Sequence, residues 1–197
     1  MRKAYWLIAV AVVLQSGTAV QSQESGGAFG VAMGQPVSSL KVVKKLQGNT
    51  YEVEVPKPNS EFEEYIVMAA PNTGVCKISA LGKTHLNDRY GSDVRSAFDH
   101  LHAALVVRYG TAKDFDFLRA GSIWNDPQDF HMGVLKKERT LTSFWDRDNG
   151  STLPVQLTSI MLDTRAVSSG PYVALSYEFA NFGKCKSVAD SSNDAGL

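Results

Sequence analysis

The chain has 197 residues, 20 basic and 20 acidic side chains, and a hydrophobic share of 44%. The chain lacks the strongly basic, clustered composition of a nucleic-acid-binding protein, so no nucleic-acid partner is expected. The length suits one domain with a full core and is short for two.

The first residues, MRKAYWLIAVAVVLQSGTAVQS, have the pattern of a secretory signal peptide. Arg2 and Lys3 precede an apolar run of eleven residues, and a small-x-small cleavage signal ends at Ala19. The run is shorter than the roughly 20 residues of a transmembrane helix. We expect cleavage after Ala19, or alternatively after Ser22, and no transmembrane segment in the mature chain. A retained membrane anchor is the competing interpretation.

The mature chain is predicted to be periplasmic or secreted, with a net charge near −2 once Arg2 and Lys3 are removed. Residues 20–28 are small, polar and Gly-rich and are expected to be disordered. Residues 29–186 are predicted to form a single domain, followed by a flexible tail over residues 187–197.

Two cysteines in an exported chain favour a disulfide. Cys76 and Cys185 are 109 positions apart, so on the chain-entropy model their bond would stabilise the fold by roughly 4 to 5 kcal/mol. The alternative is a buried Cys76 with a free Cys185 thiol. Neither cysteine lies beside a histidine, so no catalytic thiol is predicted.

Alternating apolar and polar residues predict strands in the first half of the chain. Residues 36–47 are expected to include a short helix. Residues 50–56 then predict a half-buried strand, and residues 64–71 and 75–82 predict two more, joined by a turn over 71–74.

A long amphipathic helix is predicted over residues 93–109, with Ser92 as its N-cap and Gly110 at its C-terminal end. His100 and His102 lie about 200° apart on such a helix, whereas two ligands of one metal ion need i, i+3 or i, i+4 spacing. We therefore expect no metal site at this His-x-His motif.

The second half predicts a turn over residues 114–121 and a second long helix over 126–137, which begins at Asp126-Pro127. Three further strands are predicted at residues 139–146, 155–165 and 171–179. Together these elements predict an α+β domain: an antiparallel sheet of about six strands with two main helices packed on one face.

The loop WDRDNGS, residues 145–151, is compatible with a calcium loop or a β-hairpin turn. Counted from Asp146, the fifth and twelfth residues are Gly150 and Leu157, which cannot supply the required side-chain oxygens. Asn149-Gly150 is instead typical of a hairpin turn. No metal and no other cofactor is predicted.

No catalytic motif is recognisable, so no catalytic residue is assigned. A Ser-His-Asp or paired-carboxylate site assembled by folding stays open, and His131 with Asp126 and Asp129 is the place to look for one. Solvated side chains in the first turns of a helix are the simpler interpretation.

Four segments, FGVAMGQPVSSL, GVCKI, YGTAKDFDFLRAGSIW and YEFANFGKC, cover much of the mature chain. In these segments the chain resembles small exported proteobacterial proteins of unassigned function. The resemblance implies a bacterial envelope or secreted setting and transfers no active site.

Two functions are compared. The first is an exported, non-enzymatic binding module for a protein or cell-envelope partner, and the second is a small envelope hydrolase with a His/carboxylate site. Missing catalytic signatures favour the first. Because Trp and Arg are enriched at binding hot spots, Trp124, Trp145 and Arg147 are predicted to lie on the partner surface, with burial in the core as the alternative for the tryptophans.

Overall fold

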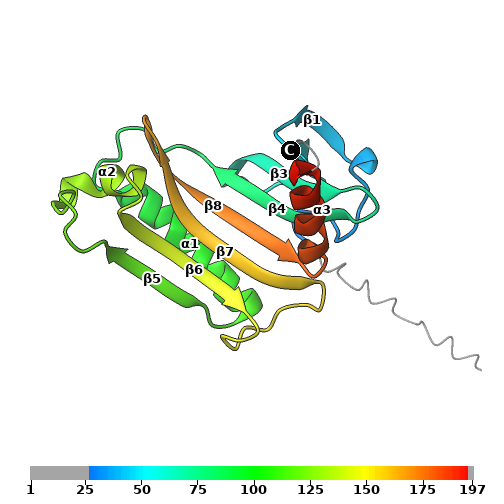
Figure 1. The fold of residues 1–197 in the computed structure, drawn as a ribbon. Coiled ribbons are helices and arrows are strands. Elements are labelled where there is room, and N and C mark those ends of the chain that lie inside the picture. Colours follow the sequence, from blue (N-terminus) through cyan, green and yellow to red (C-terminus); the bar gives the residue numbers. More distant parts are fainter. Residues whose placement is uncertain (1–26, 195–197) are drawn as a thin grey trace, which may run out of the picture.

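A computed structural model describes residues 27–194, with side chains up to Val188. The predicted signal peptide and most of the N-terminal segment predicted to be disordered lie outside the described residues. Figure 1 shows the arrangement of the elements. The strands are β1 (Lys41–Lys45), β2 (Thr50–Glu54), β3 (Phe62–Ala70), β4 (Gly74–Gly82), β5 (Lys113–Leu118), β6 (Arg139–Asp146), β7 (Leu157–Val167) and β8 (Gly170–Phe179). The helices are α1 (Ser92–Tyr109), α2 (Phe130–Leu135) and α3 (Phe182–Asp194), with 3₁₀ turns η1 (Val37–Ser39) and η2 (Pro127–Asp129).

The eight strands form one antiparallel sheet in the order β1-β2-β3-β4-β8-β7-β6-β5. The last strand of the chain, β8, pairs with β4 and so joins the strands before α1 to those after it. The predicted α+β class with an antiparallel sheet is confirmed. The sheet has two more strands than the six expected.

The two faces of the sheet carry different helices. α1 packs on β7 and β8, and α2 packs on the ends of β6, β7 and β8, whereas α3 packs on β3 and β4. Val67 and Ala69 face the main core, but their neighbour Met68 packs with Phe182 of α3, so α3 lies on the opposite face. Figure 1 shows α1 behind the sheet and α3 in front of it. The prediction of helices on one face alone is therefore incomplete.

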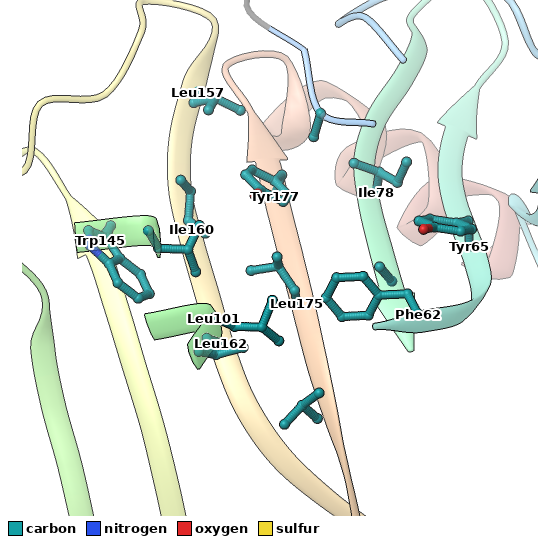
Figure 2. Close-up of a cluster of buried hydrophobic side chains, with 14 of the residues drawn as sticks. Phe62, Tyr65, Ile78, Leu101, Trp145, Leu157, Ile160, Leu162, Leu175 and Tyr177 are labelled. Carbon is teal, nitrogen blue, oxygen red and sulfur yellow. The ribbon is translucent and has the colours of Figure 1, made fainter. Parts of the chain in front are cut away.

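The main core lies between α1 and the inner face of the sheet (Figure 2). Alternate residues of each central strand point inward because successive side chains of a strand point to opposite faces. On β8 these are Val173, Leu175, Tyr177 and Phe179. α1 contributes its predicted apolar stripe, namely Val94, Phe98, Leu101, Leu105 and Tyr109.

The disulfide between Cys76 and Cys185 is present, with a Cα–Cα distance of 6.4 Å. It attaches α3 to β4, and both cysteines are buried together with Ala70. The segment predicted to be a flexible tail from residue 187 is helical as far as Asp194, because α3 continues through it. Ala28, which was assigned to the disordered N-terminal segment, is buried in the main core.

Two edge strands replace predicted non-strand segments. Residues 41–45 form β1 after a single 3₁₀ turn, although all five side chains are exposed. Residues 113–118 form β5 where a turn was expected, because their backbone pairs with β6. On β5 the carboxylates of Asp114 and Asp116 face α1, and the rings of Phe115 and Phe117 lie on the other face. The polar side chains of this strand therefore lie on the face that a helix covers, where apolar side chains are usual.

Two further local predictions need correction. The second helix is six residues long and follows a 3₁₀ turn that starts at Pro127, so it is not a long helix. β6 and β7 do pair as predicted, but residues 147–156 connect them, so the connection is longer than a two-residue Asn-Gly turn. Gly150 has a φ of 82° within it, and the Asp146 carboxylate accepts two hydrogen bonds from Asn149.

Candidate functional site

A cleft of about 720 Å³ opens between α1, β8 and the loop over residues 57–60. We call it the α1 cleft. Apolar and aromatic side chains of α1, β3 and β8, which are largely buried, form its floor, while its more polar rim comes from the 57–60 loop and from the turn at Phe29. Figure 2 shows Phe62, Leu101, Leu175 and Tyr177 of this floor, which three separate elements bring together. The floor residues are Phe62, Leu101, Leu105, Tyr109, Leu175 and Tyr177.

Phe29 enters the cleft from an unusual backbone conformation. The N–H and C=O groups of Ala28 and Val31 pair in both directions, so Phe29 and Gly30 are the central residues of a tight hairpin turn. Their φ angles are 55° and 79°. A positive φ is ordinary for Gly but rare for a bulky residue, and Asn or Gly is the usual residue at this position. The chain therefore keeps an aromatic ring here at a cost in backbone strain.

The ring of Phe29 joins an aromatic cluster beneath the cleft. It makes edge-to-face contacts with Phe62, Tyr65 and Tyr177, at centroid distances of 5.7, 5.0 and 5.7 Å. Tyr109 contacts Tyr177 in the same way at 6.4 Å. Burial raises the pKa of Tyr177 far above its ordinary value, and Tyr109 raises it further, so the phenol of Tyr177 is neutral.

The rim of the cleft is positively charged. Lys57 and Arg108 line it, and no carboxylate is found among the described residues of its lining. The guanidinium of Arg108 lies 5.4 Å from the centroid of the Tyr109 ring. The hydroxyl of Tyr65 accepts a hydrogen bond from the N–H of Asn59 at 2.7 Å, which attaches the rim loop to the aromatic cluster. The cleft thus combines a floor of largely buried aromatic and aliphatic side chains with a polar rim that includes Lys57 and Arg108.

One cluster brings a histidine, a carboxylate and a hydroxyl together, but in an order that does not suit nucleophilic catalysis. His102 Nε2 lies 3.1 Å from Asp114 Oδ1, and the hydroxyl of Ser143 donates to the same oxygen at 2.6 Å. In a catalytic triad the histidine lies between the serine and the carboxylate, where it removes the serine proton. Here the carboxylate lies between them, and Ser143 is 1% exposed.

The two histidines of the His-x-His motif diverge, as the helix predicts. His102 packs on Trp145 and Asp114, whereas His100 is exposed on another side of α1. His131 does not meet Asp126 or Asp129; its ring lies 2.8 Å from the carbonyl oxygen of Val167, at the β7–β8 turn. Within residues 27–194, no group of three His, Cys, Asp or Glu side chains is placed to hold a metal ion.

The three residues predicted for a partner surface are not brought together. Trp145 is 0% exposed, and its indole N–H donates to the carbonyl oxygen of Gly110 at 2.9 Å, so it belongs to the core. Trp124 is half-buried beside Gly133 of α2. Arg147 is exposed and donates to the carbonyl oxygen of Pro154. The eight-residue strand β6 separates the ends where Trp124 and Arg147 lie, about 25 Å at the usual rise per residue.

The residues of the α1 cleft were not predicted from the sequence, because they come from four segments with no local motif. The Phe-Gly pair at residues 29–30 is the one signal that could have drawn attention, since it occupies a turn position that normally takes Asn-Gly. Comparison of the chain with protein-family models, curated proteins and solved structures finds no match. No helix within residues 27–194 is long and apolar enough to cross a membrane.

Proposed function

We propose that this protein is an exported, non-enzymatic binding module whose α1 cleft holds an apolar or aromatic group with a negatively charged end. The observation that carries the proposal is the combination, in one cleft, of an aromatic floor and a cationic rim. Ligand sites are typically concave, mostly apolar and furnished with a few convergent polar groups. The apolar group would lie against the floor residues, and its charged end would lie near Lys57 and Arg108.

The strain at Phe29 supports the same location. A bulky residue at positive φ costs free energy, and such costs are concentrated at sites with a function. Asn would fit the turn better, but it would remove the ring that contacts Phe62, Tyr65 and Tyr177.

The export part of the proposal rests on the signal-peptide pattern of residues 1–19 and on the disulfide. An oxidising compartment is where a buried disulfide such as Cys76–Cys185 forms and persists. The partner would then be a protein or a component of the cell envelope. Expression of the full chain in a bacterium, followed by intact-mass analysis of the periplasmic fraction, tests this part. A mature chain that begins after Ala19 or Ser22 supports export, and an uncleaved cytoplasmic chain contradicts it.

Anilinonaphthalene sulfonate, an aromatic anion whose fluorescence rises in apolar sites, tests the cleft. We expect saturable binding to the folded protein. Ala104 and Ala103 are both exposed on α1, but only Ala104 lines the cleft, so Ala104→Trp should block the probe and Ala103→Trp is the matched control. A loss of affinity of about tenfold or more, or about 1.4 kcal/mol, is expected for Ala104→Trp alone. Equal binding by both variants would show that the probe lies elsewhere and would reject the cleft.

The hydrolase alternative is not favoured by the histidine cluster, because Asp114 separates His102 from Ser143 and the serine is buried. Ser143→Ala provides the direct test. If hydrolysis of a nitrophenyl ester by the purified protein were abolished by this substitution while the fold persisted, the non-enzymatic proposal would be wrong.

A further inference from the structure

A second cavity, of about 510 Å³, lies at the other end of the sheet. The pairing of β6 and β7 ends at Thr142 and Asp163, although β7 continues to Val167 and β6 begins at Arg139. The two strands separate beyond that pair, and α2 lies beside the gap. Figure 1 shows α2 and the β7–β8 turn at this same end of the molecule. We call the cavity the β6/β7 pocket.

The lining of the β6/β7 pocket is strongly cationic and rich in hydroxyls. Lys137 comes to it from the turn after α2, Arg139 from β6 and Arg165 from β7. Asp163 is the one carboxylate among the described lining residues. The hydroxyls of Thr140, Thr142, Thr164 and Tyr172 complete the polar wall. Two more cations than carboxylates, with hydroxyl donors between them, match an anion that carries several acceptor oxygens.

The guanidiniums are held in place by groups that leave donors unused. Arg165 donates from Nε to Asp163 at 2.8 Å, which is its sole hydrogen-bond partner among the described residues. Because an arginine has five N–H donors, its terminal nitrogens remain available. Arg139 lies on the α1 side of the sheet, where it shares the carboxylate of Asp116 with Arg95, so two guanidiniums compete for one acceptor and a net positive charge remains there. Asp163 and Arg165 point to the opposite face from the core residues of β7, so they line the gap between β6 and β7 from its other side.

Three buried polar atoms of the pocket residues have no hydrogen-bond partner: Arg139 Nε, Asp163 Oδ1 and Thr164 Oγ1. Only one other such atom, Asn181 Oδ1, occurs among the described side chains. Buried polar groups in folded proteins are nearly always paired, so this concentration marks a wall whose hydrogen bonds are incomplete. An oxygen of a ligand in the gap could accept hydrogen bonds from Arg139 Nε and from the Thr164 hydroxyl. Asp163 Oδ1 is itself an acceptor, so it would need a donor, such as the hydroxyl of a protonated phosphate oxygen.

Lys137 occupies a position that favours glycine. The N–H of Lys137 donates to the carbonyl oxygen of Val134, and the N–H of Glu138 donates to that of Gly133, which is the hydrogen-bond pattern of a Schellman motif at the end of α2. Lys137 is the left-handed residue of that motif, with a φ of 58°. Glycine is usual there because it adopts positive φ without strain. This chain has a lysine at the position instead, and Lys137 is one of the residues that line the pocket.

We propose that the β6/β7 pocket is a binding site for a phosphate-type oxyanion, held by Lys137, Arg139 and Arg165. Phosphate suits this site better than a single carboxylate because it offers more acceptor oxygens and more charge to cations that approach from three segments of the chain. The proposal is independent of the α1 cleft, which is lined by none of these residues.

The experiment is a titration of the ¹⁵N-labelled mature protein with sodium phosphate, followed by NMR at constant ionic strength maintained with sodium chloride. We expect saturable shifts concentrated at the backbone amides of residues 137–140 and 164–166, and weaker binding of acetate. Lys137→Gly should weaken phosphate binding at least tenfold while leaving the melting temperature unchanged or raised, because the glycine relieves the strain. Arg165→Gln should weaken binding to a similar extent.

Lys136→Ala is the matched control, because Lys136 is the exposed neighbour of Lys137 and does not line the pocket. Its affinity for phosphate should stay within about twofold of the original protein. The proposal is overturned if phosphate causes no saturable shifts, if Lys137→Gly and Lys136→Ala bind phosphate equally well, or if acetate binds as tightly as phosphate.

Discussion

The carboxylate of Asp88 accepts a hydrogen bond from the backbone N–H of Ser92 at 2.8 Å and so caps helix α1 from outside it. The other carboxylate oxygen accepts from the N–H groups of Asp93 and Val94. Ser92 was predicted to be the N-cap, but it is the first helical residue, and Gly91 before it has a φ of 74° that returns the chain toward Asp88. The first-turn N–H groups of α1 are therefore satisfied by one buried carboxylate.

Asp88→Ala is expected to destabilise the protein by about 2 kcal/mol, because three N–H groups at a helix N-terminus lose a charged acceptor. Urea unfolding of the variant measures this change. Asp93→Ala is the control, since Asp93 is exposed in the same turn and should change the free energy of unfolding by less than about 0.5 kcal/mol. Equal effects of the two substitutions would show that general helix-dipole charge, and not the cap, stabilises α1.

The central strands and α1 were predictable from the sequence because each has one buried face. Apolar residues therefore recur with the period of a strand or a helix. The edge strands were not. β1 buries no side chain, so KVVKK carries no alternation, and the pairing of β5 with β6 holds Asp114 and Asp116 on the side that α1 covers. The cap at Asp88 was missed because residues 89–91 separate it from the first helical residue. The α1 cleft and the β6/β7 pocket depend on residues that only the tertiary fold brings together.

Reduction of the disulfide is expected to lower the free energy of unfolding by about 4 kcal/mol, because the bond between Cys76 and Cys185 closes a loop of 109 positions in the unfolded chain. Unfolding in urea with and without a reductant measures this loss. A Cys76→Ala/Cys185→Ala variant should resemble the reduced protein and be insensitive to the reductant. If the reductant still lowered the stability of this variant, its effect could not come from the disulfide, and the prediction would be wrong.

Asp116 is expected to make stability rise with pH through the acidic range. Partial burial alone would raise the pKa of its carboxyl, but hydrogen bonds and charge from Arg95, together with Arg139, outweigh it and hold that pKa below the ordinary 3.8. A lowered folded-state pKa means that its stabilisation is fully present above 3.8 and is lost as the pH falls through the folded-state value. Asp116→Asn should therefore destabilise the protein more at neutral pH than in strong acid, as measured by urea unfolding across that range.

Asp163 is expected to act in the opposite direction. Burial raises the pKa of its carboxyl above 3.8 even though Arg165 and Lys77 oppose the shift. The folded state then holds its proton more tightly than the unfolded state, so its contribution to stability is largest below 3.8 and declines as the pH rises through the folded-state value. Asp163→Asn should remove this decline and cost less stability at neutral pH than in acid. A cost that is greatest at neutral pH would show that the ion pair with Arg165 outweighs the burial of the charge.

Trp145 should behave as a core residue and not as a partner contact. It shares the inner face of β6 with Leu141 and Ser143, and this period of two already places it toward α1. Trp145→Phe removes the hydrogen bond to Gly110 and leaves the Gly110 carbonyl without that donor, so we expect a loss of about 2 kcal/mol in the free energy of unfolding. Arg147→Ala, at the exposed loop that follows, should change it by less than about 0.5 kcal/mol. Unfolding in urea, monitored by circular dichroism, compares the two variants. Unchanged stability of Trp145→Phe would contradict the buried position of the indole and return this residue to the candidates for a partner surface.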